Sequence, residues 1–467
     1  MQTGELPGVA WVDITVSDLA RWADEWGAME NEMFQGPLDQ RKRWLFSLGV
    51  FFVGILAIIS VYSLRLNGPP IRSDGVGYYL YLPAIFIHQD LSLQRLATEH
   101  FNGQIPAWTG VTLFEGTQNY LIKYPIGEAV LMAPFFLLAG LAAHALGVKV
   151  DGFSYPFQIA AALSGLVYAV AGLAILWGIL QRRFKQNTIL LVLFGLVFGT
   201  NFFHYASYDS IFSHIYSFFL FCAFLYLVEQ IYSRPSLRNC LAAGAVAGLI
   251  IVTRPTNTLW LLFGVLFGVT SIKGLLDRYQ FWKSHIKECL LGLVPLLGIV
   301  ALQLIYWKVI TGRFMVYSYR NEHFHFLRPE IVNVLFSAKK GLLFWSPILL
   351  AVFPGLFYLK KRAPEFFVSI VLFFPLNVYI ISSWYCWWYG GSFGARAFTE
   401  SLPVFAIGLC SFYEGVRSSF GKRMLRGFIF FSVAYSIWLM AKYWTGVIPF
   451  DGVTGDYFLK TFFIIKK

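Results

Sequence analysis

The chain has 467 residues, of which 57% are hydrophobic and only 13% are charged. An ordinary soluble protein is about a quarter charged, so this composition excludes intrinsic disorder and disfavours a water-soluble fold. The net charge of +12 does not indicate a nucleic-acid partner, because the basic residues lie between long apolar runs and form no single basic face. We therefore expect an all-α polytopic membrane protein.

Residues 1–43 differ in kind from the rest of the chain. Many of the acids lie there, and Leu19, Trp22, Trp26, Met29 and Met33 recur at steps of three and four residues. This stripe predicts a short amphipathic helix on a membrane surface or a partner, with a partly ordered tail as the alternative. It is not a signal peptide, because it has no apolar core region.

Residues 44–442 form the predicted transmembrane domain. Apolar runs long enough to cross about 30 Å of hydrocarbon predict eleven spans. They lie near residues 45–63, 157–180, 188–204, 211–228, 239–253, 256–272, 288–307, 341–359, 366–383, 399–414 and 426–442.

A twelfth apolar run, at residues 125–146, is also long enough to cross. If this run does not cross, the connections between spans that are rich in Lys and Arg all fall on the same side of the membrane. The positive-inside rule identifies that side as the cytoplasm. We therefore expect residues 125–146 to form a re-entrant or juxtamembrane helix that begins at Pro125. A chain of twelve spans is the alternative.

This topology places the N-terminus in the cytoplasm and the longer loops outside. The first external loop covers residues 64–156, two further outer segments cover 308–340 and 382–398, and residues 443–467 form an external tail. The centres of the spans hold no acid or base of the kind that marks a proton relay. Functional residues are therefore expected at the outer ends of the helices.

Two acids lie in outer turns. Asp74 belongs to the segment SDGVGYYLYLP, residues 73–83, which predicts a turn opening an apolar helix. Asp209 and His214 lie in the turn between the third and fourth predicted spans. Each acid has the simpler reading of a helix cap, and His214 that of an interface residue.

Arginine and histidine mark three more outer segments. Arg254 precedes Pro255 between two short spans, where it either reaches lipid headgroups or grips a phosphate through its planar fork. Arg320 precedes Glu322, His323 and His325. We expect no metal site there, because alternate residues of an extended loop face opposite ways.

The third segment, WYCWWYGGSFGAR at residues 384–396, contains Trp387, Trp388 and Arg396. An interfacial aromatic belt would explain the aromatic residues, but it does not require the glycine pair or the arginine.

The order of these segments resembles bacterial GT-C glycosyltransferases, the broad set that includes aminoarabinose transferases and protein O-mannosyltransferases. The resemblance covers about residues 45–442. It is carried by Asp74 after the first span, the KYPIGE helix start at 123–128, Asp209, the Arg254-Pro255 hairpin and the WWYGGSFGAR segment.

The resemblance implies a sugar donor on a polyprenyl phosphate and a glycan, lipid or protein acceptor at the external face of the plasma (inner) membrane. Asp74 would be the general base of an inverting transfer, with Asp209 as a second, looser acidic match. A divalent metal is the one candidate cofactor. Many relatives carry a second acid beside the first, where this chain has Gly75.

The leaving lipid phosphate gains negative charge as the glycosidic bond breaks, so guanidinium groups near it would lower the barrier. Arg254, Arg396 and Arg320 are the candidates. Tyr78, Tyr81, Trp387 and Trp388 are the candidates for stacking on the sugar or holding the isoprenoid. Two alternatives remain: a lipid-linked sugar flippase or transporter, and a noncatalytic scaffold with this fold.

Overall fold

The computed structural model describes residues 37–63 and 68–464. The amphipathic helix predicted within residues 1–36 therefore lies outside the described residues. The chain divides into two compact units, Met1–Phe46 and Ser47–Lys467. Every contact discussed below lies within the second unit.

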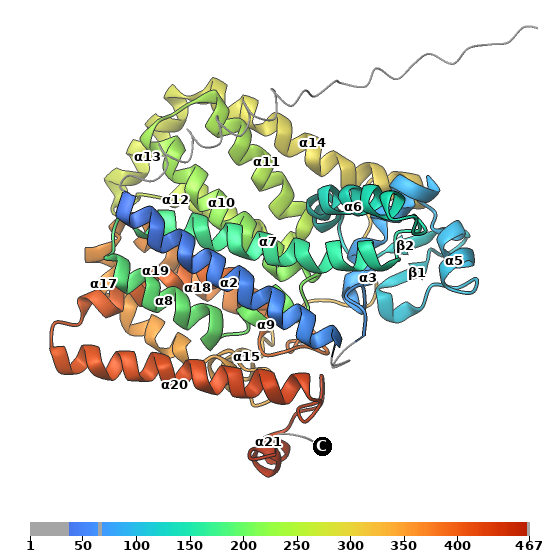
Figure 1. Ribbon diagram of the computed structural model, residues 1–467. Coiled ribbons are helices and arrows are strands. Elements are labelled where there is room, and N and C mark those ends of the chain that lie inside the picture. Colours follow the sequence, from blue (N-terminus) through green and yellow to red (C-terminus); the bar gives the residue numbers. More distant parts are fainter. Residues whose placement is uncertain (1–36, 64–67, 465–467) are drawn as a thin grey trace, which may run out of the picture. The chain divides into compact units, whose positions relative to one another are not determined.

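Apolar helices dominate the structure (Figure 1). Within the described ranges, seven are long and apolar enough to cross a bilayer. They are α2 (Pro37–Ser63), α6 (Gly127–Ala145), α7 (Tyr155–Leu180), α10 (Ser213–Ser233), α14 (Ile286–Thr311), α18 (Pro364–Ser382) and α20 (Ser419–Trp444). The chain is thus a multi-pass, mostly helical membrane protein, as its composition predicts.

The remaining elements are short. The helices between and after the long ones are α8 (Gln186–Gly199), α9 (Phe202–Ser207), α11 (Leu237–Thr253), η3 (Pro255–Leu261), α12 (Leu262–Leu266), α13 (Ile272–Ser284), α15 (Ile331–Phe336), α16 (Leu342–Trp345), η4 (Pro347–Ala351), α17 (Val352–Arg362), η5 (Arg396–Ser401), α19 (Leu402–Gly415) and α21 (Gly455–Thr461).

The segment predicted to be the first external loop folds into its own small elements ahead of α6. They are α3 (Asp74–Tyr79), α4 (Tyr81–Pro83), η1 (Ala84–His88), α5 (Gln94–His100), η2 (Ala107–Thr109), β1 (Val111–Leu113) and β2 (Tyr120–Ile122). The two strands pair antiparallel. Figure 1 shows α3, α5, β1 and β2 gathered at one end of the helices.

Each predicted span contains helix, but several are shorter or broken. The run at 341–359 divides into α16, η4 and α17 because Pro347 lacks the N–H that a continuous helix needs. The run at 256–272 holds only η3 and α12, and α8 has 14 residues. Apolar length alone therefore leaves the number of crossings open.

The long helices expose apolar side chains outward, as expected in lipid. On α14, Leu290, Val294, Leu297, Ile305 and Val309 are all exposed. In water such a face would be an aggregation hazard, whereas hydrocarbon solvates it.

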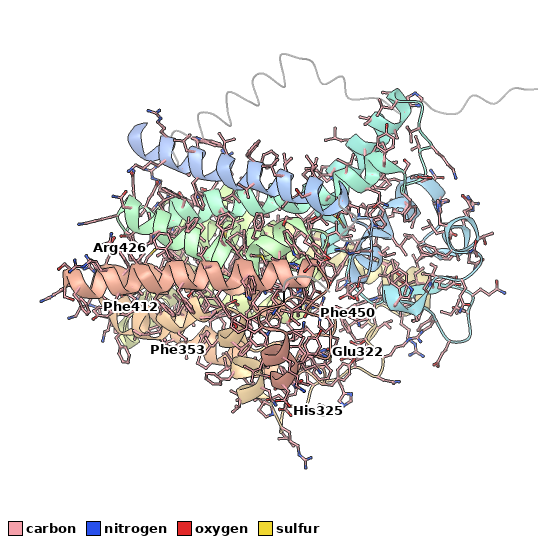
Figure 2. All side chains as sticks on the ribbon, turned by 60° about the horizontal axis from the view of Figure 1, so that its bottom comes forward. Glu322, His325, Phe353, Phe412, Arg426 and Phe450 are labelled. Atoms are coloured by element: carbon pink, nitrogen blue, oxygen red, sulfur yellow. The ribbon has the colours of Figure 1, made fainter. Side chains whose placement is uncertain are left out.

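Several of the predicted cytoplasmic segments meet at one end of the bundle. Arg183, just after α7, bonds both Glu229 near the end of α10 and Glu365 at the start of α18. Arg362 pairs with Glu414 at the end of α19. In Figure 2, Arg426 and Phe412 lie toward this end, and Glu322 and Phe450 lie toward the other.

The polar outer segments meet at the opposite end. Helix α10 begins at Ser213 among them and reaches Glu229 at the basic end. Sixteen residues of helix at 1.5 Å each separate the two ends by about 24 Å, close to the thickness of a bilayer's hydrocarbon core.

Helix α6 lies beside the polar half of the bundle. The hydroxyl of Tyr168, midway along α7, donates to the Leu131 carbonyl, while the Phe136 ring packs on Phe157 near the start of α7. Helix α6 thus leads away from the basic end, and it exposes Leu138 and Leu141. Helix α6 is also one of the seven helices long and apolar enough to cross, so the re-entrant or juxtamembrane placement stays a prediction.

Candidate functional site

A cavity of about 930 Å³ opens among the polar outer segments. Its lining includes Asp74 and Tyr78 from α3, Asp209, Arg254 after α11, Arg396 at the start of η5, and the segment after α20 up to Phe450. Elements far apart in sequence therefore build one hollow, in the size range of small-molecule sites.

An ion pair between Asp74 and Arg396 lies in this cavity. Nη2 of Arg396 is 3.0 Å from Oδ2 of Asp74, and the two side chains are 12% and 25% exposed. Burial lowers the pKa of Arg396, but the Asp74 carboxylate and the neighbouring tyrosines together raise it above the usual value. Nε of Arg396 is buried and has no hydrogen-bond partner among the described residues.

The local backbone holds Asp74 at the start of α3. Ser73 occupies the N-cap position with φ of 49°, a conformation rare for a residue with a side chain, and makes no side-chain capping bond. Asp74 is the first helical residue, and its carboxylate pairs with Arg396. Helix capping is therefore not the only role that the geometry gives Asp74.

Gly75 faces away from the polar chemistry. A Cβ atom on Gly75 would lie 2.3 Å from Cδ1 of Ile211, far inside contact distance. A second acid at this position would have to displace the buried Ile211 side chain. The packing accounts for glycine where the resemblance leads one to expect an acid.

Arg254 forms a second polar group with His214 and Glu400. Nη1 of Arg254 is 2.8 Å from Nδ1 of His214 and 3.4 Å from Oε1 of Glu400. Burial lowers the pKa of Arg254, but Glu400 and the neighbouring tyrosines together raise it above the usual value. Glu400 and Arg396 both belong to η5, so one short helix supports both arginines.

Asp209 is held by two donors. Its Oδ1 accepts from Nη2 of Arg72 at 2.5 Å, and its Oδ2 contacts Nε2 of His204 at 2.8 Å. Trp444 Nε1, which can only donate, bonds Nδ1 of His204 at 3.0 Å. His204 Nδ1 is therefore an acceptor, so in the neutral ring the proton is on Nε2 and is donated to Asp209.

The directions in which the pKa values of Asp209 and His204 are shifted agree with that assignment. Burial raises the pKa of Asp209, but Arg72 and His204 together bring it well below its usual range. Burial lowers the pKa of His204, so the ring is neutral near pH 7. Asp209 is an ionised carboxylate that fixes Arg72 at the cavity wall.

The cavity lining also includes a further ion pair and a tyrosine stack. Lys123 Nζ donates to Glu322 at 2.6 Å and lies 5.0 Å from the ring centre of Tyr319. The rings of Tyr78 and Tyr124 stack with centroids 4.2 Å apart. Burial raises the pKa of both phenols, so they are neutral surfaces on which a ligand ring can stack.

The cavity is thus polar but nearly balanced in charge. Each of its cations has a carboxylate partner: Arg72 with Asp209, Lys123 with Glu322, Arg254 with Glu400, and Arg396 with Asp74. An anionic ligand would have to share these cations with their carboxylates.

Some predicted site residues do not reach the cavity. Arg320 does not line it, and its guanidinium donates to the Leu113 carbonyl. Tyr81 is fully buried and donates to the Tyr124 carbonyl. Trp387 and Trp388 line a small separate hollow. Of the predicted set, Asp74, Asp209, Arg254, Arg396 and Tyr78 come together.

The expectation for the two loop histidines is wrong in its geometry. The rings of His323 and His325 do not face opposite ways, because their centroids are 4.5 Å apart. The chain is extended at this point, where Phe324 forms an isolated β-bridge with Trp384, and residues two apart in an extended chain lie on the same face. Glu322 is nevertheless engaged by Lys123, so it does not join the two imidazoles.

Four charged residues of the site were missed in the sequence. Arg72 lies two residues before Asp74, Lys123 begins the KYPIGE segment, and Glu400 lies inside a run assigned to a span. The fourth is Lys340, which is almost fully buried. Their proximity to the predicted segments was the available signal.

Lys340 ties two cavity segments together. Its Nζ donates to the carbonyls of Ser392 and Phe450, the latter at 3.0 Å. Burial, the largest cause, lowers the pKa of Lys340 to about 7. In the unfolded chain the ordinary value is about 10.4.

We expect this lysine to make stability depend on pH. Between about pH 7 and 10 the unfolded chain binds a proton at Lys340 that the folded chain does not, so the stability from this group rises with pH. The melting temperature of the wild type minus that of Lys340→Met should increase between pH 7 and 9 in detergent. A difference that stays constant or falls would contradict the assignment.

Comparison with protein-family profiles, curated proteins and solved structures finds no match to this chain. The cavity and its side chains are therefore the basis for assigning a function.

Proposed function

We propose that the protein is a membrane glycosyltransferase that moves a sugar from a polyprenyl-phosphate donor to an acceptor hydroxyl at the external face of the membrane. The observation that carries the proposal is the Asp74–Arg396 ion pair, within a cavity that Arg254 also lines. A carboxylate next to guanidinium groups supplies both a proton acceptor and a phosphate-binding group, the two requirements of this reaction.

The proposed reaction proceeds in one displacement. The acceptor oxygen forms a bond to the anomeric carbon as the bond from that carbon to the phosphate oxygen breaks. The electron pair leaves with the phosphate, the hydroxyl proton passes to Asp74, and the anomeric configuration inverts. Arg254 and Arg396 stabilise the charge that develops on the leaving phosphate.

Arg396 links donor binding to the base. Its guanidinium pairs with Asp74. The phosphate of the sugar donor would compete with Asp74 for the N–H groups of Arg396. Its binding would free a carboxylate oxygen of Asp74 to accept a proton. Donor binding before acceptor activation would also limit loss of the donor to water.

We assign Asp209 a positioning role in this scheme. Both of its oxygens are engaged, by Arg72 and by His204, so it has little capacity to receive a proton. It holds Arg72 at the cavity wall, where Arg72 is a third cation for the phosphate.

The charge distribution supports the proposed orientation. Arg182, Arg183, Arg362 and the other basic residues near them would lie in the cytoplasm by the positive-inside rule, and the cavity would then face outward. A plasma (inner) membrane location with a cytoplasmic N-terminus follows from this orientation.

A transporter is less well supported. The Asp, Glu, His, Lys and Arg side chains of the described long helices lie near the helix ends, and the middle of each helix has none. A carrier for a charged lipid or sugar would need a polar path between the ends.

Lipid binding tests the proposal directly. Purified full-length protein in detergent is titrated with undecaprenyl phosphate and, as a matched control, with undecaprenol, and binding is followed by native mass spectrometry. We expect the phosphate to bind and the alcohol to bind at least about tenfold more weakly, because charge-assisted hydrogen bonds contribute about 1.5–3 kcal/mol. Equal binding of the two, or binding of neither, would refute the proposal.

A further inference from the structure

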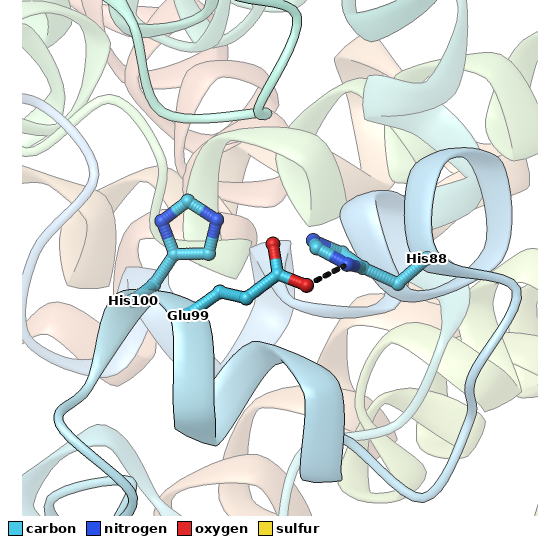
Figure 3. Close-up of side chains that lie close together, drawn as sticks. All are labelled: His88, Glu99 and His100. Carbon is cyan, nitrogen blue, oxygen red and sulfur yellow. Dashed lines mark ion pairs between the residues drawn. The ribbon is translucent and has the colours of Figure 1, made fainter.

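The first external loop brings together two histidines and a glutamate outside the cavity. His88 ends η1, and Glu99 and His100 end α5. One ligating atom from each side chain lies within 4.8 Å of the others, and within the described ranges this is the one group of three such residues. Figure 3 shows the Glu99 carboxylate between the two imidazole rings.

These side chains have no other evident task. Nδ1 of His88 is 3.7 Å from Glu99, too far for a hydrogen bond. Nε2 of His88 and Nε2 of His100 are both buried and lack a hydrogen-bond partner among the described residues. His88 is only 8% exposed. Buried polar atoms are normally satisfied, so these unpaired nitrogens require an explanation.

The backbone around the cluster is well fixed. After His88 the chain turns at Gln89, whose φ is 50°. The Asp90 carboxylate then accepts the N–H groups of Ser92 and Arg95 at the start of α5. Arg95 Nη1 returns to the His88 carbonyl at 3.2 Å, so both ends of the connection are held.

The far side of the cluster is also packed. The centre of the His100 ring lies 4.6 Å from the centre of the Phe153 ring, and Phe101 packs edge-on to Phe153. The two histidines are therefore presented by a rigid scaffold, which lowers the cost of gathering them around an ion.

We propose that His88, Glu99 and His100 bind one zinc ion that joins η1 to α5. Two imidazoles and one carboxylate are a ligand set typical of zinc, with a fourth position left for water. Zinc bonds of about 2.0–2.1 Å place tetrahedral ligand atoms about 3.3 Å apart. Small side-chain rotations from the observed spacing are enough to reach that geometry.

The ion would have a structural role. None of the three residues lines the cavity. Helix η1 follows α4 directly, and α4 follows α3, which carries Asp74. A bond between η1 and α5 would stabilise the external loop on the side of the cavity that holds Asp74.

Metal analysis of the intact protein tests this proposal. Tag-free full-length protein in detergent is stripped with EDTA, incubated with zinc chloride, desalted and measured by elemental mass spectrometry. We expect about one zinc per chain in the wild type, loss of that zinc in His88→Ala/His100→Ala, and weaker binding in Glu99→Gln. The matched control is His323→Ala/His325→Ala, a second neighbouring histidine pair, which should bind zinc like the wild type.

The outcomes separate cleanly. Three outcomes would each overturn the proposal. They are zinc retained by His88→Ala/His100→Ala, zinc lost from the His323→Ala/His325→Ala control, and no zinc bound to the wild type at micromolar concentration. If the double variant fails to fold, Glu99→Gln gives the answer, because it keeps both imidazoles and the side-chain shape. Its zinc affinity should fall at least about tenfold, and an unchanged affinity counts against the site.

Discussion

Asp74→Asn should abolish sugar transfer while leaving polyprenyl-phosphate binding intact. The amide keeps the shape of the side chain but cannot accept the acceptor's proton. Loss of a general base costs about 10²- to 10⁴-fold in rate. The measurement is the transfer rate with whichever polyprenyl-phosphate sugar a donor screen identifies, alongside undecaprenyl phosphate affinity.

Glu322→Gln is the matched control for this experiment. Glu322 is also a cavity carboxylate paired with a cation, and its exposure of 26% is close to the 25% of Asp74. We expect this variant to keep most of its transfer rate. Activity in Asp74→Asn, or equal loss in both variants, would show that Asp74 is not the base. Melting temperatures would exclude a folding defect caused by leaving Arg396 unpaired.

Arg254→Gln should weaken undecaprenyl phosphate binding by about 10- to 100-fold, the value of a charge-assisted hydrogen bond. The KM for the acceptor should change much less, because the proposed contact is with the donor phosphate. The undecaprenyl phosphate affinity of Arg254→Lys should lie between those of the wild type and Arg254→Gln, because lysine keeps the charge but lacks the planar guanidinium. Calorimetry or competition gives the affinity, and steady-state kinetics gives the KM.

Arg320→Gln is the control for the arginine series. Arg320 lies outside the cavity and donates to a backbone carbonyl, so its replacement should not change donor affinity. A loss in this variant equal to that in Arg254→Gln would indicate a nonspecific effect of surface charge. Undiminished donor affinity in Arg254→Gln would remove Arg254 from the phosphate site.

The helices could be read from the sequence because each apolar run is a local property of the chain. The start of α3 at Asp74 and the long α7, α10, α14 and α20 follow directly from such runs. The distribution of basic residues also predicted that the segments around Arg183, Glu229 and Glu365 lie on the same side, and these segments are in contact. Helix ends that lie inside apolar runs were harder to predict, as the break at Pro347 illustrates.

The pairing of side chains within the site was beyond sequence reasoning. Asp74 and Arg396 could be placed on the same side of the membrane, but their 3.0 Å contact depends on how η5 packs beside α3. Tyr81 is buried against Tyr124 and Tyr306, whereas Arg320 stays at the surface and bonds the Leu113 carbonyl. Rotation of a helix about its axis redirects every side chain without changing the hydrophobic pattern.

The sequence therefore established the bilayer environment, the helical class and the segments where polar groups gather, because these depend on composition and on neighbours along the chain. Which charges neutralise one another, and that His88 meets Glu99 and His100, emerged from the folded chain alone. Such contacts join segments separated by turns or whole helices, and the register of packing between those segments leaves no local trace in the residue order.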